Sequence, residues 1–191
     1  MKIYFIIFGL LNLCALLVQF VHSPDIVGFF SFFTILANAC ATGILLYLGL
    51  SHKKTISIKT ESFFGATTAY MVLVGFGYWM FLSNVKYPMM LPFVNIMIHA
   101  VMPIVVIIGW FLYEHQHRLN FKRATNWLIF PFVWLIYTFV RGPLAHWYPY
   151  PFFDPRGING YSGVFEYILI FTLVLYFVSL FIIWIGNKKQ N

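Results

Sequence analysis

The chain has 191 residues, of which 61% are hydrophobic and only 9% carry a charged side chain. A water-soluble globule of this length could not hide so much apolar surface. A disordered chain or a nucleic-acid-binding domain is excluded on the same grounds, despite the formal net charge of +7. The composition therefore predicts an all-α, multi-pass integral membrane protein whose partner is the lipid bilayer and not nucleic acid.

Six stretches of the chain are long and apolar enough to cross a bilayer, which takes about 20 residues each. In chain order they are Ile3–Val21, Ile26–Leu50, Phe63–Leu82, Phe93–Tyr113, Trp127–Val140 (running on toward Leu144) and Val164–Ile185. The first is predicted to be a retained helix and not a signal peptide, because it is too long and no small-residue cleavage site follows it. Residues 1–191 are expected to form a single six-helix transmembrane domain with short tails and loops.

The distribution of lysine and arginine predicts the orientation of these helices. Most of the lysines and arginines fall on one side of a six-helix bundle: Lys2, Lys53, Lys54, Lys59, Arg118, Lys122, Arg123, Lys188 and Lys189. Only Lys86, Arg141 and Arg156 fall on the other side. Because cytoplasmic loops are rich in basic residues, both termini are expected to be cytoplasmic.

Polar side chains recur at helical spacing inside three of the spans. Lipid accepts polar groups poorly, so these side chains are predicted to face the interior of the bundle. In the second span they lie within about an 80° arc of the helix. The polar residues are Ser31, Thr34, Asn38 and Thr42 in the second span, Asn95 and His99 in the fourth, which align with Met102 and Gly109, and Asn12 and Gln19 in the first, which align with Gly9. Any one of them taken alone is typical of a hydrogen bond between helices.

Two of these polar residues are expected at similar depths in the membrane. At 1.5 Å per residue, Thr34 lies about 12 Å and His99 about 9 Å below the predicted outer ends of their spans. A hydroxyl beside a histidine base is the pair that nucleophilic catalysis requires. We therefore expect Thr34 to be a nucleophile and His99 its base. Asn38 and Asn95, one turn away, are candidates to orient the histidine or to stabilise an oxyanion.

The segment Arg141–Gly163 is rich in aromatic residues and proline, which predicts an aromatic belt or a lid at the end of the bundle. Arg141 has two interpretations. It could make a structural contact, namely an ion pair with Glu166 or Asp154 or a contact with a phosphate group. Alternatively, it could clamp a lipid carboxylate. The same two acids are the candidates for a third catalytic member. Further candidates for contact with a substrate are Tyr137, Trp147 and Tyr150.

The histidines do not predict a metal site. Those expected near the outer face have no partner at ligand spacing on one helix: His22, His99 and His146. His115 and His117, at the other end of the fourth span, are expected to be solvated. The chain also has no phosphate-binding glycine motif, so neither a metal nor a cofactor is expected.

Three short motifs resemble those of one known family. Phe32-Phe33-Thr34-Ile35-Leu36-Ala37-Asn38 resembles the F-T-x-x-x-N element of the androgen-induced protein family, which includes the androgen-dependent TFPI-regulating protein and a six-helix bacterial branch. His99-Ala100-Val101-Met102-Pro103 resembles its histidine-then-proline element. Arg141-Gly142-Pro143 and Trp147-Tyr148-Pro149-Tyr150-Pro151-Phe152 resemble its aromatic loop before the last helix. The likeness covers all six spans in order.

Animal members of that family are intramembrane threonine hydrolases that cleave fatty acid esters of hydroxy fatty acids with one threonine and one histidine. The resemblance implies these roles for Thr34 and His99, a membrane lipid as substrate, and a place in the bacterial cytoplasmic membrane. Two alternatives stay open, namely a small-molecule transporter or channel and a non-catalytic membrane scaffold. The sequence makes no prediction of the oligomeric state.

Overall fold

The computed structural model describes residues 1–53, 55–85, 90–157 and 160–190, and within these ranges every regular element is a helix. The α-helices are α1 (Lys2–His22), α2 (Ile26–Ser31), α3 (Phe33–Leu50), α4 (Ile58–Gly77), α5 (Pro92–Ile96), α6 (Met102–Leu112), α7 (Lys122–Trp127), α8 (Ile129–Ala145) and α9 (Gly160–Lys188). The other elements are two π-helical turns, η1 (Tyr78–Leu82) and η2 (Met97–Val101), and the 3-10 turn η3 (Pro151–Phe153). Lys54 and Lys86, which count toward the predicted charge bias, lie outside the described residues.

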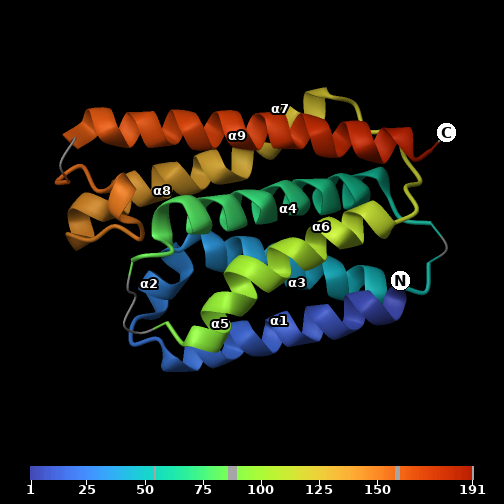
Figure 1. Ribbon diagram of the computed structural model, residues 1–191, viewed down its shortest axis with the longest axis horizontal. Coiled ribbons are helices and arrows are strands. Elements are labelled where there is room, and N and C mark those ends of the chain that lie inside the picture. Colours follow the sequence, from blue (N-terminus) through green and yellow to red (C-terminus); the bar gives the residue numbers. More distant parts are fainter. Residues whose placement is uncertain (54, 86–89, 158–159, 191) are drawn as a thin grey trace.

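Six helical segments are long and apolar enough to cross a membrane. They are Lys2–His22, Phe33–Leu50, Ile58–Leu82, Pro92–Leu112, Lys122–Ala145 and Gly160–Lys188. The prediction of an all-helical chain with six membrane-length helices is confirmed. The long helices run side by side, and the N- and C-termini lie at the same end of the bundle (Figure 1), as an even number of crossings requires.

The second predicted span is not one continuous helix. Phe32 has an extended backbone (φ −77°, ψ 122°) that separates α2 from α3. The carboxylate of Asp25 caps α2 by accepting the N–H groups of Val27 and Gly28, and α2 departs from the axis of α3 (Figure 1). The expectation of a single helix over Ile26–Leu50 is therefore wrong. As a consequence, Thr34 lies in the first turn of its helix and not in the third.

The core of the bundle is formed around α3 and α4, the two most buried spans. α4 packs against α3, α6 and α9, and α1 packs along α3. The side-chain amide of Asn12 in α1 donates to the carbonyl oxygen of Asn38 at 3.0 Å and to Oγ1 of Thr42 at 2.9 Å. The polar sets of the first and second spans thus face each other, as the helical spacing predicts.

The fifth span continues past Val140, as its predicted extension toward Leu144 indicates. α8 continues through Arg141 and Pro143 to Ala145, and the chain leaves the helix at His146, whose left-handed backbone has φ 49°. The predicted loop therefore begins at His146 and not at Arg141. Proline is tolerated in a membrane helix where neighbouring groups satisfy the freed carbonyl. Arg141 accordingly has a fixed position on the last turns of a helix.

The carboxylate of Glu61 connects α4 to the segment that follows α6. It is fully buried and accepts hydrogen bonds from Nδ1 of His115 at 3.0 Å, from the backbone N–H of Gln116 at 3.2 Å and from that of His117 at 3.1 Å. Nε2 of His117 donates to the carbonyl oxygen of Ile56 at 2.7 Å. The expectation of solvated histidines is wrong: the His115 side chain is fully buried and His117 is half-buried. A buried carboxylate needs such donors, and these residues supply them.

Glu61→Gln is expected to lower the free energy of unfolding by about 1–3 kcal/mol, because the amide NH₂ group cannot accept the hydrogen bonds that a carboxylate oxygen accepts. Denaturant unfolding of the purified protein in detergent measures the effect. Glu114→Gln is the matched control, since Glu114 is exposed on the same segment and its change should stay within about 0.5 kcal/mol. Equal losses for the two variants would contradict this role of Glu61.

Candidate functional site

Thr34 is held at the start of α3 by a tyrosine from the far end of the sequence. The hydroxyl oxygen of Tyr150 lies 3.1 Å from the backbone nitrogen of Thr34 and 3.1 Å from its Oγ1. The N-cap residue Phe32 makes no side-chain capping bond, so Tyr150 accepts an N–H group that would have no partner within the helix. Tyr150, predicted to contact a substrate, thus contacts the predicted nucleophile directly.

The surroundings of Thr34 favour negative charge. Burial raises the pKa of Tyr150 to about 12, so its hydroxyl stays protonated and able to donate a hydrogen bond at neutral pH. The first turn of α3 also places the positive end of the helix dipole at this point. Both features stabilise charge that develops on an oxygen atom beside Thr34.

His99 lies in the π-helical turn η2, and its local sequence explains the irregular helix. Pro103, four residues later, has no N–H for the carbonyl of His99, and its ring would clash with that carbonyl in a regular α-helix. The imidazole stacks on the ring of Tyr78 in the other π-helical turn, with 4.2 Å between ring centroids and 20° between planes. Single π-helical turns inside helices occur often at functional sites.

The hydrogen bond of His99 fixes which ring nitrogen is basic. Nδ1 lies 3.1 Å from the carbonyl oxygen of Asn95. A carbonyl can only accept, so Nδ1 must carry the proton, and in the neutral ring the lone pair is on Nε2. The Asn95 side chain in turn donates to the hydroxyl of Tyr78 at 2.6 Å. Asn95 therefore orients both the histidine and the ring on which it stacks.

Asn38 connects the two predicted catalytic residues through the backbone. Its side-chain nitrogen donates to the carbonyl oxygen of Thr34 at 2.9 Å and to that of Ile98 at 3.1 Å. Both amide hydrogens are thereby used, which leaves none to donate to an oxyanion. Of the two roles expected for Asn38, the geometry fits positioning.

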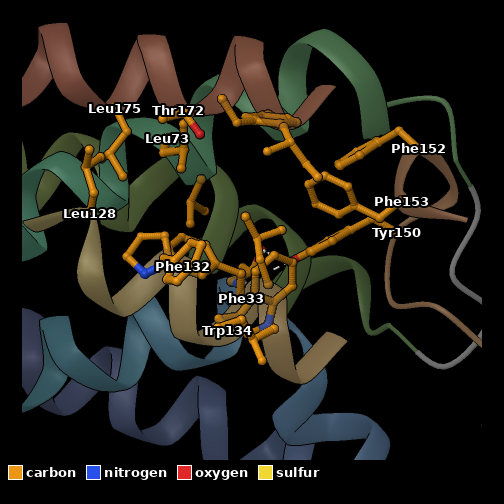
Figure 2. A pocket seen from close by; sticks show the side chains of 18 of the residues that line it. Phe33, Leu73, Leu128, Phe132, Trp134, Tyr150, Phe152, Phe153, Thr172 and Leu175 are labelled. Carbon is orange, nitrogen blue, oxygen red and sulfur yellow. Dashed lines mark hydrogen bonds between the residues drawn. The ribbon is translucent and has the colours of Figure 1, made fainter. Parts of the chain in front are cut away.

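Thr34 and His99 line the same small cavity of about 20 Å³, which is large enough for one water molecule. Thr34 also lines a much larger cavity of about 790 Å³ between α3, α4, α8, α9 and the η3 loop (Figure 2). The residues common to both are Thr34, Tyr78, Leu82 and Tyr150. Within the described residues no hydrogen bond joins the Thr34 and His99 side chains directly. Thr34 thus lies at the boundary between the large apolar cavity and the small cavity that contains the histidine.

Arg141 lies beside this site but does not line either cavity. Its guanidinium is 3.7 Å from the carboxylate of Asp25, which caps α2, and lies over the Trp147 ring at 5.2 Å from the centroid. Trp147 in turn packs edge-on against Phe32, with 5.6 Å between ring centroids. The expected ion pair with Glu166 or Asp154 is wrong, because Asp25 is the nearer acid. Arg141 and Trp147 hold the break between α2 and α3.

Tyr137 also has a structural contact, and its contact with a substrate stays a prediction. Its hydroxyl lies 2.8 Å from Oγ of Ser31, and the indole N–H of Trp134 donates to the Ser31 carbonyl at 2.9 Å. Tyr137 lines neither cavity. These bonds attach α8 to the end of α2.

Neither acid considered as a third catalytic member contacts His99 among the described residues. Asp154 makes an exposed ion pair with Arg156 at 2.6 Å, and the hydrogen bonds from Arg156 lower the pKa of Asp154. Glu166 is exposed on the first turns of α9. In the described part of the chain, no three His, Cys, Asp or Glu side chains are grouped as a metal site would require.

Tyr78 is the site residue that the sequence did not indicate. No spacing or motif relates it to His99, since it lies on another span. The proline four residues after His99 is a sequence signal for an irregular turn at the histidine, but it does not identify the ring that stacks on the imidazole. No protein-family model, curated protein or solved structure matches this chain. The fold and site define a helical protein with six membrane-length helices, in which a small cavity lined by Thr34 and His99 lies beside a large apolar cavity.

Proposed function

We propose that this protein is an intramembrane lipid-ester hydrolase with Thr34 as nucleophile and His99 as base. The observation that carries the proposal is that Thr34 lines both cavities. One has a volume within the range of small-molecule sites, about 300–1,000 Å³, and an apolar lining. The other contains the imidazole. An ester whose hydrocarbon part occupies the large cavity would present its carbonyl carbon to the threonine hydroxyl.

The reaction follows from these positions. Nε2 of His99 takes the Thr34 proton through the water that the small cavity can hold, as Oγ1 forms a bond to the carbonyl carbon. The Tyr150 hydroxyl and the start of α3 stabilise the oxyanion. Collapse of this tetrahedral intermediate breaks the ester C–O bond, and the departing alkoxide takes the proton from His99. A water molecule then attacks the acyl-threonine with His99 again as base, which releases the fatty acid and restores the hydroxyl.

The substrates to test first are fatty acid esters of hydroxy fatty acids, as the resemblance of the Thr34 and His99 motifs implies. The charge bias of the loops supports cytoplasmic termini, and on that orientation Thr34 acts on lipids of the outer leaflet. The resemblance to the bacterial branch favours the bacterial cytoplasmic membrane.

The proposal is tested with the purified protein in proteoliposomes that contain fatty acid esters of hydroxy fatty acids, triacylglycerol or phospholipid. Mass spectrometry should detect free fatty acid from at least one class over many turnovers. A fluorophosphonate probe should label the protein only when Thr34 is present. Movement of intact ester between leaflets, with no cleavage of any class, would favour a transporter, and neither activity would favour a scaffold.

Tyr150→Phe is expected to lower kcat by about 100-fold, the effect of removing one oxyanion donor. The remaining ring keeps its packing, so KM should change little. Since the pKa of Tyr150 is about 12, its hydroxyl donates throughout the neutral range, and the loss should be the same at pH 6 and pH 9. Tyr148→Phe is the control, because Tyr148 lines neither cavity. Equal activity of the two variants would remove Tyr150 from the mechanism.

A further inference from the structure

We propose that the large cavity binds one hydrocarbon chain of a bilayer lipid, that this chain enters sideways between α8 and α9, and that Leu128 limits its length. That the bound lipid is an ester rests on the proposed function. Binding of its hydrocarbon chain does not, because binding can be measured without hydrolysis.

The chemistry of the cavity wall fits a hydrocarbon chain. No charged side chain is among the described residues that line it, so a headgroup would find no ionic partner there. One end is formed by Tyr150, Phe152 and Phe153, and the other by Leu128 and Leu175 (Figure 2). The hydroxyl groups of Thr34 and Tyr150 therefore lie toward one end, and the residues that line the rest of the cavity are mostly apolar, with Thr125 and Thr172 among them.

The cavity is open on the side of the bundle that faces lipid. Phe132, Ile136 and Val140 of α8 line it and are nevertheless 61%, 50% and 62% exposed. Thr172 on α9 is likewise a lining residue that is exposed. Among the described residues, α9 packs closely on α4 but not on α8. Because both helices belong to membrane spans, what faces this opening is the hydrocarbon region of the bilayer.

The end of the cavity at the η3 loop is closed. Phe152 packs against Tyr167 and Phe171 of α9, each at 5.2 Å between ring centroids. It also stacks on Tyr150, with 5.4 Å between centroids. A lipid therefore cannot reach Thr34 along the bundle axis past this aromatic cluster, and the opening between α8 and α9 is the available route.

The far end of the cavity sets the length of chain beyond the carbonyl. Trp134 marks the level of Thr34, since its ring lies 5.8 Å from that of Tyr150 and its indole bonds to Ser31. Leu128 is six residues away on the continuation of the same span, or about 9 Å at the helical rise. A larger side chain at Leu128 should shorten the space available to the chain.

The test is photo-crosslinking in proteoliposomes with an ester lipid that carries a diazirine at the end of its acyl chain. Thr34→Val keeps the probe intact during labelling. We expect label on Val74 and Leu175, which line the cavity but are only 5% and 2% exposed and so are out of reach of bulk lipid. Label confined to lipid-facing residues outside the cavity, such as Val133 and Phe177, would overturn the proposal.

Chain length is tested with the same probe in several lengths. Leu128→Trp should shift the best-labelling chain to one about two carbons shorter, because an extended chain advances about 1.2 Å per bond and the indole reaches about 3 Å further from Cα than leucine does. Val133→Trp is the matched control, since it adds the same ring on the same span outside the cavity, and it should leave the profile unchanged. An unchanged profile in Leu128→Trp would contradict the limit. Label inside the cavity without hydrolysis by the wild type would leave this inference standing and remove the proposed function.

Discussion

Thr34→Val is expected to abolish ester hydrolysis, with a loss of about 1,000-fold or more, as removal of a nucleophile in hydrolases of this type produces. Valine has nearly the shape of threonine, so both cavities keep their form. The backbone N–H of Thr34 keeps its bond to Tyr150, so the start of α3 is preserved. What disappears is the oxygen atom that would bond to the acyl carbon.

Two further variants separate chemistry from packing. Thr34→Ser keeps a hydroxyl and should retain measurable turnover. Thr42→Val removes a hydroxyl from the same helix, where it accepts a hydrogen bond from Asn12, and should cost about 1 kcal/mol of stability while activity per folded molecule stays unchanged. Hydrolysis by Thr34→Val at the rate of the wild type would exclude the threonine as nucleophile.

His99→Gln is expected to lower kcat by about 10²–10⁴-fold, the usual contribution of a general base. Glutamine is polar and of similar length, but it cannot take a proton near neutral pH. Because the ester is held by the large cavity, KM should change little. The neutral imidazole is the acting base, so the rate of the wild type should fall in acid, where the ring becomes protonated, and the variant should lose this dependence.

The pH profile distinguishes a base from a structural residue. A histidine that only stacks on Tyr78 would change stability when it is replaced, and the remaining activity would keep the shape of its pH profile. His146→Gln is the control, since His146 is exposed at the end of α8. Parallel profiles for the wild type and His99→Gln would contradict a role in proton transfer.

The spans were predictable because a bilayer demands about 20 apolar residues per crossing, and that demand is visible in composition alone. The break at Phe32 was not predictable. Phe32 lies between Ser31 and Phe33, residues that also occur within continuous membrane helices, and no glycine or proline stands at the boundary. What ends α2 there is contact with distant residues, including the Tyr137 hydroxyl on Ser31 and the Tyr150 hydroxyl on Thr34.

The sequence indicated which polar residues face the interior of the bundle but not which spans pack against each other. The polar stripes indicated that Asn12, Asn38 and Thr42 face inward, and these residues form hydrogen bonds with one another. Glu61 precedes the third predicted span, which begins at Phe63, whereas the helix begins at Ile58 and includes Glu61. Its buried position depends on donors from His115 to His117, more than fifty residues away.

The large cavity had no counterpart in the sequence. It exists because α9 packs on α4, whereas α8 is attached to the segment around α2. The attachments are the hydrogen bond of Trp134 to Ser31 and the ion pair of Arg141 with Asp25. An apolar residue that lines a cavity and one that faces lipid have the same hydropathy, so Leu128 and Val133 are indistinguishable by pattern. Only the relative placement of the helices separates them.

The most direct measurement is mass spectrometry of the protein quenched during turnover of an ester lipid. If the proton relay at the small cavity serves acyl transfer, a peptide that contains Thr34 should carry the mass of the acyl group. The adduct should be absent in Thr34→Val. In variants of Tyr150 or His99, it should accumulate if the replacement slows deacylation more than acylation. Steady hydrolysis with an acyl group on another residue, or unimpaired hydrolysis by Thr34→Val, would contradict the account.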